Sequence, residues 1–453
     1  MSRVFSVRAA GVGDSRRDGP SGAGEGPGGL PPVRRLRVAL VAPPYFDVPP
    51  AGYGGVEAMV ADLADALVAR GHSVTLIGAG RAGTAAAFVP VWDRTVPERL
   101  GEPFPEVMHA AASRRAVEWL AREAGLDVVH DHTLAGPLNA PAYAALGVPT
   151  VVTVHGPVTG DLRGYYRALG DDAHLVAISG RQRELAPELN WLATVHNALR
   201  VEDWPFRARK QDYALFLGRF CPDKAPHLAL DAAHAAGVPL VLAGKCAEPA
   251  EKEYFEAAVR PRLTAADHVF GVADARAKRE LLAGARCLLF PVCWEEPFGM
   301  VMIEAMACGT PVVALRAGAV PEVVADRVTG LICDTPDELA PALGKVRDID
   351  PAACRAHVAR HFSAGSLAEG YEAAYRHAMA RTRTGRAAAG GAPGAADSAL
   401  EVLRRDYPAL DRELDRTYEQ RRPGAVIHRA GEAARADLPG GTTAQAGAPG
   451  TAA

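Results

Sequence analysis

Short apolar runs of strand length alternate with helical segments along this chain, and that alternation restricts its fold more than any other feature. The first unit consists of an apolar run at 36–42, a helical segment at 56–71 and a second apolar run at 73–79. The helical segment places its apolar residues at 3.6-residue spacing, and Gly71 stands where a C-terminal cap belongs. A strand, a helix and a strand in this succession form a crossover unit with parallel strands. The pattern predicts an α/β fold.

The same pattern recurs in two consecutive sets. Further apolar runs lie at 127–132, 150–156, 175–180 and 213–220. A stretch that contains proline and many charges, 196–212, separates the two sets and is typical of a domain boundary. We therefore expect two doubly wound Rossmann-like domains facing a cleft, at 36–200 and 201–362.

The two ends of the chain differ in composition from the rest. Residues 1–35 are rich in Gly and Pro and bury too little apolar surface to offset the entropy of ordering, which predicts a disordered arm. Residues 383–453 form a low-complexity tail, in which the segment 400–420 has the apolar spacing of a short helix. We assign no function to this segment.

Composition excludes several classes of protein. Apolar residues make up 49% and charged residues 23% of the chain, as in ordinary globular proteins. The 50 Lys and Arg residues and the 53 Asp and Glu residues give a net charge of −3, so no global positive field attracts nucleic acid. The sequence has neither an apolar run long enough to span a membrane nor a start like that of a signal peptide. We expect a cytoplasmic protein.

We expect no metal site. The seven cysteines are an odd number without a C-x-x-C pair, which is typical of reduced thiols. His130 and His132 lie two residues apart on a predicted strand, without carboxylate or cysteine partners at a known ligand spacing.

One acidic stretch carries the most informative pattern, because it reads as strand, loop, helix, turn and strand. Glu296 lies just before the helix and Glu304 lies inside it, so the two carboxylates are stacked along one site. At the helix start, the backbone N–H groups of Gly299, Met300 and Val301 are free to bind an anion such as a phosphate. The alternative is that Glu296 only caps the helix and that Glu304 lies on a solvated face.

Seven short motifs occur in the order and spacing of a known family. They are GYGGVE, VTVHG, AISGRQRE, VHNAL, GRFCPDKAP, EPFGMVMIEAMACGTPVVA and AGAVPEVV, and the similarity extends from about 36 to 379. With its two glutamates separated by seven residues, the longest motif resembles the signature of glycosyltransferase family 4, the group 1 retaining glycosyltransferases of GT-B fold. The resemblance implies an enzyme that transfers a sugar from a nucleotide-diphosphate sugar to an acceptor. It further implies retention of the anomeric configuration and the absence of a metal or other cofactor.

The resemblance also implies an arrangement of the domains. The C-terminal domain binds the donor and the N-terminal domain binds the acceptor. A helix at 363–382 resembles the one that returns to complete the N-terminal domain, with its apolar stripe facing that domain.

Roles for particular residues follow from the resemblance. Arg219 and Lys224 correspond to two cations on the donor diphosphate, where they stabilise the negative charge that grows as the diphosphate leaves. Glu296 corresponds to a carboxylate facing the donor sugar, and Glu304 to one that accepts hydrogen bonds from the ribose hydroxyls. His155, at a predicted strand end, is assigned to the sugar site.

Loops add further expectations. Gly54 and Gly55 correspond to a pair that approaches the donor phosphates across the cleft. The loop 271–274 resembles the one that packs on the nucleotide base. Gly318 and Ala319 stand where many members of the family have two glycines, and this difference predicts a tighter pocket.

We expect as partners a nucleotide sugar and a small-molecule, glycan or lipid acceptor, and no nucleic acid. A helical segment at 105–125 carries three arginines, which leaves a weak peripheral membrane contact open, although Glu118 and Glu123 dilute its basic face. A non-catalytic GT-B protein that binds a sugar nucleotide, or a GT-B epimerase, is the alternative function. The intact set of charged site residues argues against the non-catalytic protein.

Overall fold

A computed structural model describes residues 34–389 of the chain. The expected arm at 1–35 lies outside the described residues except for its last two, and the helix expected at 400–420 lies outside them as well.

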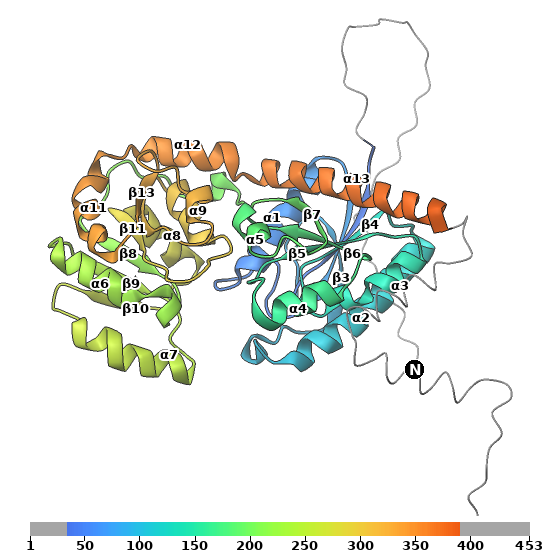
Figure 1. The fold of residues 1–453 in the computed structure, drawn as a ribbon, viewed down its shortest axis with the longest axis horizontal. Helices are drawn as coiled ribbons and strands as arrows, with labels where there is room; N and C mark the ends of the chain where they lie inside the picture. Colours follow the sequence, from blue (N-terminus) through green and yellow to red (C-terminus); the bar gives the residue numbers. More distant parts are fainter. Residues whose placement is uncertain (1–33, 390–453) are drawn as a thin grey trace, which may run out of the picture. The chain divides into compact units, whose positions relative to one another are not determined.

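The N-terminal half contains a parallel sheet of seven strands in the order β3-β2-β1-β4-β5-β6-β7 (Figure 1). Its strands are β1 (Arg37–Val41), β2 (Ser73–Ala79), β3 (Ala87–Trp92), β4 (Val128–Asp131), β5 (Thr150–Val154), β6 (Ala173–Ala177) and β7 (Trp191–Thr194). The central strands are buried along nearly their whole length, which is why they read as continuous apolar runs. The sequence pattern did not predict the edge strands β3 and β7.

The C-terminal half contains a second parallel sheet, in the order β10-β9-β8-β11-β12-β13. Its strands are β8 (Ala214–Leu217), β9 (Leu240–Ala243), β10 (His268–Gly271), β11 (Cys287–Phe290), β12 (Val312–Leu315) and β13 (Gly330–Cys333). Two parallel sheets with crossover helices confirm the predicted α/β class and the two doubly wound sets of strands.

Helices connect most successive strands, and the last three helices follow the final strand, β13. The helices are α1 (Gly55–Ala69), α2 (Pro103–Glu123), α3 (Ala140–Ala145), α4 (Gly160–Ala168), α5 (Gly180–Leu185), α6 (Pro226–Ala235), α7 (Pro249–Tyr254), α8 (Ala275–Gly284), α9 (Met300–Ala307), α10 (Val320–Val323), α11 (Leu339–Lys345), α12 (Pro351–His361) and α13 (Ala364–Ala389). Helix α1 buries Met59, Leu63 and Leu67 against the first sheet, as its 3.6-residue spacing predicts. Within the described range, no helix has the length and apolar content that crossing a bilayer requires.

Each sheet has one point at which the strand order reverses. In the first sheet it lies between β1 and β4, and in the second between β8 and β11. Loops that follow such strands diverge and leave a crevice at the carboxyl ends of the strands. Nine of the ten predicted site residues follow β1, β8 or β11, and His155 follows β5, the neighbour of β4, which explains how residues far apart in sequence reach one place.

Two segments connect the halves and run side by side. Leu199 donates its backbone N–H to the carbonyl of Phe362 at 3.1 Å and accepts a hydrogen bond from the N–H of Ala364 at 3.1 Å. Beyond this point α13 crosses to the half that carries β1–β7 (Figure 1). Helix α13 continues to Ala389, past the end expected at 382, because its last turns are rich in the strong helix formers Ala and Arg.

Candidate active site

Glu296 lies in the loop between β11 and α9 and is held by two partners. Lys224, from the loop after β8, forms an ion pair with its carboxylate, and the indole N–H of Trp294 donates to the same oxygen at 2.8 Å. The Lys224 ammonium also lies 5.0 Å from the centre of the Trp294 ring. Glu296 does not cap the helix, because the N-cap of α9 is Gly299 and has no side-chain cap.

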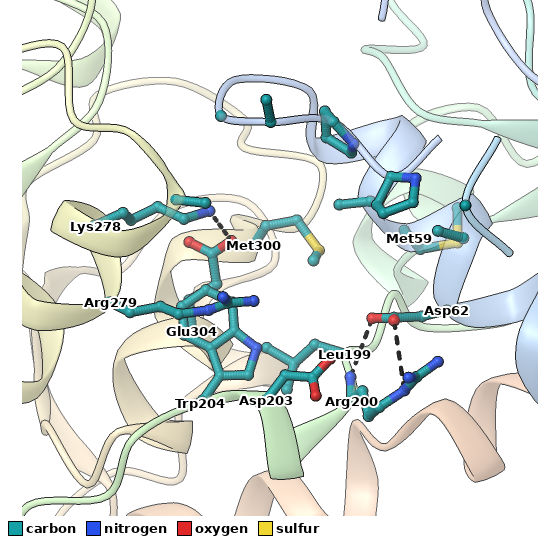
Figure 2. A pocket seen from close by; sticks show the side chains of 18 of the residues that line it. Met59, Asp62, Leu199, Arg200, Asp203, Trp204, Lys278, Arg279, Met300 and Glu304 are labelled. Atoms are coloured by element: carbon teal, nitrogen blue, oxygen red, sulfur yellow. Dashed lines mark hydrogen bonds and ion pairs between the residues drawn. The ribbon is translucent and has the colours of Figure 1, made fainter. Parts of the chain in front are cut away.

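Glu304 is the fifth residue of α9 and is only 8% exposed, so it does not lie on a solvated face. Lys278 on α8 donates to its carboxylate at 2.7 Å, and the two side chains face each other in Figure 2. The same ammonium lies 5.2 Å from the ring centre of Trp204, in the segment that joins the halves. A cation therefore neutralises each of the two carboxylates of the acidic motif.

The loop before α10 supports Glu296 through its backbone. Ala319 donates its N–H to the Glu296 carbonyl at 2.9 Å. Gly318 has φ +51°, and a Cβ on it would collide with the backbone of Glu296. Only the first of the two positions therefore requires a glycine at this contact. At the second position, Ala319 is fully buried without backbone strain.

Six of the predicted donor-site residues line one pocket of about 540 Å³. They are Gly54, Gly55, Arg219, Met300, Val301 and Glu304. The pocket, called the central pocket below, has walls from both halves of the chain. Val272 and Ala273, of the loop expected to pack on a base, also line it.

The central pocket is suited to an anion. The N-termini of α1 and α9 border it, and neither helix has a side-chain cap among the described residues, so their first N–H groups are free to bind a ligand. Arg219, Lys245 and Lys278 add cationic groups to its wall. Burial raises the pKa of Glu57, in the first turn of α1, to about 7, which weakens its negative charge there.

Arg219 has one acidic neighbour among the described residues. Its guanidinium lies 3.6 Å from the carboxylate of Glu251, which is almost fully buried at the start of α7. That contact is too long for a normal hydrogen bond and leaves the guanidinium able to bind a ligand.

Four predicted residues lie outside the lining of the central pocket: Lys224, Glu296, Gly299 and His155. Glu296 instead lines a smaller pocket of about 220 Å³, called the lateral pocket, together with Thr159 and Arg181 of the N-terminal half. Pro157, two residues after His155, lines it too. Gly299 directly precedes Met300, which lines the central pocket.

His155 follows β5 and forms a hydrogen bond with a second histidine. Its Nε2 lies 3.0 Å from Nδ1 of His132, which follows β4, and the two rings are stacked. Burial lowers the pKa of His155 to about 4 and that of His132 well below its ordinary value. Both imidazoles are therefore neutral at pH 7.

Of the two histidines considered for a metal, His130 is held by protein groups at both ring nitrogens. His130 bonds the hydroxyl of Tyr375 at 2.8 Å and that of Thr153 at 2.7 Å, so both of its ring nitrogens are used. Tyr371 bonds the same threonine hydroxyl at 2.7 Å. All seven cysteines are free thiols.

A third pocket of about 390 Å³, called the hinge pocket, shares Lys278, Met300 and Glu304 with the central pocket (Figure 2). On its other side, Asp62 of α1 accepts the backbone N–H of Arg200 at 3.0 Å. The Glu304 carboxylate therefore lies where two pockets between the halves meet.

Family comparisons follow this division of the chain. The family described as glycosyl transferases group 1 matches residues 202–352, and Glycosyltransferase Family 4 matches residues 53–184. The alpha-maltose-1-phosphate synthase of Mycobacterium tuberculosis (strain CDC 1551 / Oshkosh) is 31% identical over 344 residues, which cover 65% of this chain and 84% of that protein. The chain belongs to the group 1 glycosyltransferases of GT-B fold.

The similarity to other relatives also extends over most of their length. The phosphatidyl-myo-inositol mannosyltransferase of the same organism is 29% identical, over 68% of this chain and 85% of that protein. Among solved structures, AviGT4, a glycosyltransferase involved in avilamycin A biosynthesis, is 27% identical with a TM-score of 0.58, over 76% of this chain and 98% of that one.

The group 1 motifs did not reveal three residues of the site. Lys278 pairs with Glu304, Lys245 lines the central pocket, and His132 bonds His155. Lys278 lies one helical turn after Asp274, the N-cap of α8, so its place on the helix after the expected base loop was the one signal that could have found it.

Proposed function

We propose that this group 1 glycosyltransferase transfers a sugar from a nucleotide-diphosphate sugar to an acceptor with retention of configuration and without a metal. The observation that carries the proposal is the central pocket, where two uncapped helix N-termini, Arg219 and the buried Glu304 meet. A diphosphate fits the helix ends and the arginine, and ribose hydroxyls fit the carboxylate. Anabaena Alr3699/HepE, which shares the fold, has been solved with UDP-glucose.

The proposed step needs no placed base. The bond from the anomeric carbon to the diphosphate oxygen breaks, and a bond to the acceptor oxygen forms on the same face of the sugar. The proton of the acceptor hydroxyl goes to the departing phosphate oxygen. Arg219 and Lys224 stabilise the negative charge that accumulates on the diphosphate, and Glu296 faces the positive charge that develops on the sugar.

Charge pairing in the site supports metal independence. Glu296 is paired with Lys224 and Glu304 with Lys278. Neither carboxylate is left to share a divalent cation, whereas cations and helix ends are already present for the diphosphate.

The decisive experiment measures release of nucleotide diphosphate from UDP-, GDP-, ADP- and TDP-sugars, with and without a cytosolic acceptor extract. We expect release from one donor, unchanged by EDTA, and a product whose anomeric coupling in NMR matches that of the donor. Inversion of the anomeric centre or loss of activity in EDTA would contradict the finer proposal. Nucleotide binding without release from any donor, on a broad acceptor panel, would favour the non-catalytic protein.

We place the acceptor on the N-terminal half, beside an exposed apolar strip. Leu100 lines the central pocket and is 44% exposed, and Phe104, Val107 and Met108 follow it on one face of α2 with about half of their surface exposed. Apolar patches of this kind mark ligand grooves or membrane contacts. They support the proposal of a lipid or other apolar acceptor with a weak peripheral membrane contact.

Co-sedimentation with anionic phospholipid vesicles at low salt tests that contact. We expect the wild-type protein to bind and the double variant Phe104→Ser, Met108→Ser to bind several-fold less. No binding by the wild type would refute the contact and leave the transfer reaction untouched.

The free cysteines support action in the cytoplasm. Only Cys293 is exposed, and burial raises the pKa of Cys287 and Cys308 to about 12, so these thiols stay protonated and unreactive. A reducing compartment is where such a protein keeps seven thiols.

A further inference from the structure

In the part of the chain that the structure describes, the buried imidazole of His132 has a single hydrogen-bond partner. His132 is 4% exposed, and its Nδ1 lies 3.0 Å from Nε2 of His155. Among the described residues, its other nitrogen, Nε2, has no hydrogen-bond partner. A neutral imidazole carries one N–H and one lone pair, so this arrangement restricts where the protons of the pair can be.

Two proton arrangements satisfy the bond between the rings. In one, His132 donates from Nδ1 and His155 accepts at Nε2. In the other, His155 donates from Nε2, and His132 must then hold its proton on the buried, unpartnered Nε2. Buried N–H groups without an acceptor are rare in proteins, whereas unpaired acceptors are tolerated more often.

Neighbouring groups do not supply an alternative. His130 packs its ring 4.0 Å from that of His132, but both of its nitrogens are occupied by Tyr375 and Thr153. Protonation of the pair is opposed by burial, which lowers the pKa of all three histidines. The choice is therefore between two neutral tautomers.

We propose that His132 is a positioning residue that holds His155 as its Nδ1–H tautomer. With Nε2 of His155 used as an acceptor, the only proton of this ring is on Nδ1. His155 is then a neutral donor, able to give a hydrogen bond to a sugar hydroxyl or to a phosphate oxygen, and unable to accept one. This consequence for transfer rests on the sugar-site role of His155 in the proposed function.

The proton position can be read without any enzyme assay. In protein labelled with ¹⁵N-histidine, long-range ¹H–¹⁵N correlation separates protonated from unprotonated ring nitrogens, and the spectrum of His155→Gln identifies the signals of His155. We expect Nδ1 of His155 to be protonated and Nε2 to be unprotonated in the free protein. The reverse assignment in the wild type would overturn the proposal.

Replacing His132 by asparagine or by glutamine distinguishes the effect of a hydrogen-bond donor at the position of Nδ1 from the effect of side-chain volume. The amide nitrogen of asparagine matches the position of Nδ1 in histidine, and that of glutamine matches Nε2. In His132→Asn we expect His155 to keep its Nδ1 proton, whereas in His132→Gln and His132→Leu we expect its proton to move partly to Nε2. An unchanged His155 spectrum in His132→Leu would overturn the proposal.

His130→Asn is the matched structural control. It shortens an equally buried neighbour and removes the bond from its Nε2 to Thr153, so it should lower the melting temperature while the His155 tautomer stays the same. A changed tautomer in this control would show that general loosening, and not the bond from His132, sets the proton.

Kinetics test the consequence for transfer. We expect kcat to fall about tenfold in His132→Leu, the size of one hydrogen bond, and to fall much less in His132→Asn, with the KM for the donor changed less than kcat in both. An unchanged kcat in His132→Leu would refute the contribution to transfer. A wild-type protein without transfer activity would refute the proposed function, while the spectra would still decide the tautomer.

Discussion

At the scale of single residues, the site holds its charges in pairs before any substrate arrives. Glu296 and Lys224 form one pair, and Glu304 and Lys278 the other. Because the partners are fixed, the groups lose little freedom when the substrate binds, and the charges are already oriented when the diphosphate leaves. Buried carboxylates without such partners would be costly.

Lys224→Met tests the charge on the leaving group. We expect kcat to fall about 10²-fold, because in the proposed reaction this lysine stabilises charge that grows toward the transition state, while the KM for the donor changes only a few-fold. Steady-state release of nucleotide diphosphate gives both values. Lys345→Met, an exposed lysine at the end of α11, is the control and should behave as the wild type.

Equal kcat values for Lys224→Met and the wild type would contradict the role of this lysine. Because the substitution also frees Glu296, Lys224→Arg provides a second measurement. It keeps the positive charge and should retain more activity than the methionine variant.

At the scale of elements, α13 is fixed to the first sheet by a buried carboxylate. Glu372 is 4% exposed and accepts hydrogen bonds from Arg70 at 2.5 Å and Arg376 at 3.2 Å, and it bonds the ring of His72 at 2.8 Å. Burial alone would raise the pKa of Glu372, but these bonds outweigh it and lower the pKa to about 2.

Glu372→Gln should make the protein less stable at neutral pH. A carboxyl whose pKa falls from 4.5 to about 2 on folding contributes stability above pH 4.5 that is lost as the pH falls toward 2. The shift corresponds to roughly 3 kcal/mol at pH 7 as an upper value. Denaturant unfolding of both proteins from pH 7 to pH 3.5 should show the difference between them shrinking as the pH falls.

Comparing the wild type with Glu372→Gln separates the pH dependence due to this residue from that of carboxyls whose pKa is raised on folding. Burial raises the pKa of Glu57 and of Asp131 to about 7, and both are present in both proteins. Glu369→Gln on the same helix is the control, since its exposed ion pair with Arg70 should be worth less than about 1 kcal/mol. A difference independent of pH would contradict the charged contribution of Glu372.

Short sequence patterns predicted many of the helices and strands, but not which side chains from different elements pair with each other. Glu296, Gly299 and Glu304 lie within nine residues on one loop and helix, so their relation follows from helix geometry. Lys278 reaches Glu304 by packing of α8 on α9, which no short pattern encodes. Strand β3 was missed because it is a half-exposed edge strand that contains proline and lacks the apolar run of a central strand.

At the scale of the whole molecule, contacts beside the lateral pocket join the two halves. Arg181 on α5 bonds both carboxylate oxygens of Glu295 at 2.8 and 2.9 Å. Glu322 accepts the backbone N–H groups of Gly180 and Arg181 at 2.7 Å each, and it bonds His196 at 3.0 Å. These contacts tie the N-terminal half to the loop that carries Glu296, so we expect any closure of the halves on the donor to involve this loop.

Arg181→Gln should weaken donor binding. The ion pair with Glu295 is about 40% exposed on both sides, so we expect it to contribute at most about 1 kcal/mol, or about fivefold in the Kd of the nucleotide. If loss of this ion pair reduces the fraction of closed protein, the apparent affinity for the nucleotide falls by the factor by which that fraction falls. Isothermal titration calorimetry with the nucleotide measures the Kd.

Arg183→Gln, two residues along the same helix and exposed, is the control for this contact. Equal Kd values in both variants and the wild type would show that the contact between Arg181 and Glu295 does not take part in closure.

The crossing of α13 also has a consequence for how a ribosome makes this protein. Tyr375 bonds His130, which lies 245 residues earlier in the chain, and Tyr371 bonds Thr153, which lies 218 residues earlier. The first sheet therefore emerges from the exit tunnel long before the helix that covers it, and the whole second sheet is translated in between. A nascent chain halted before 364 lacks both tyrosines and leaves the surface that α13 covers exposed to chaperones.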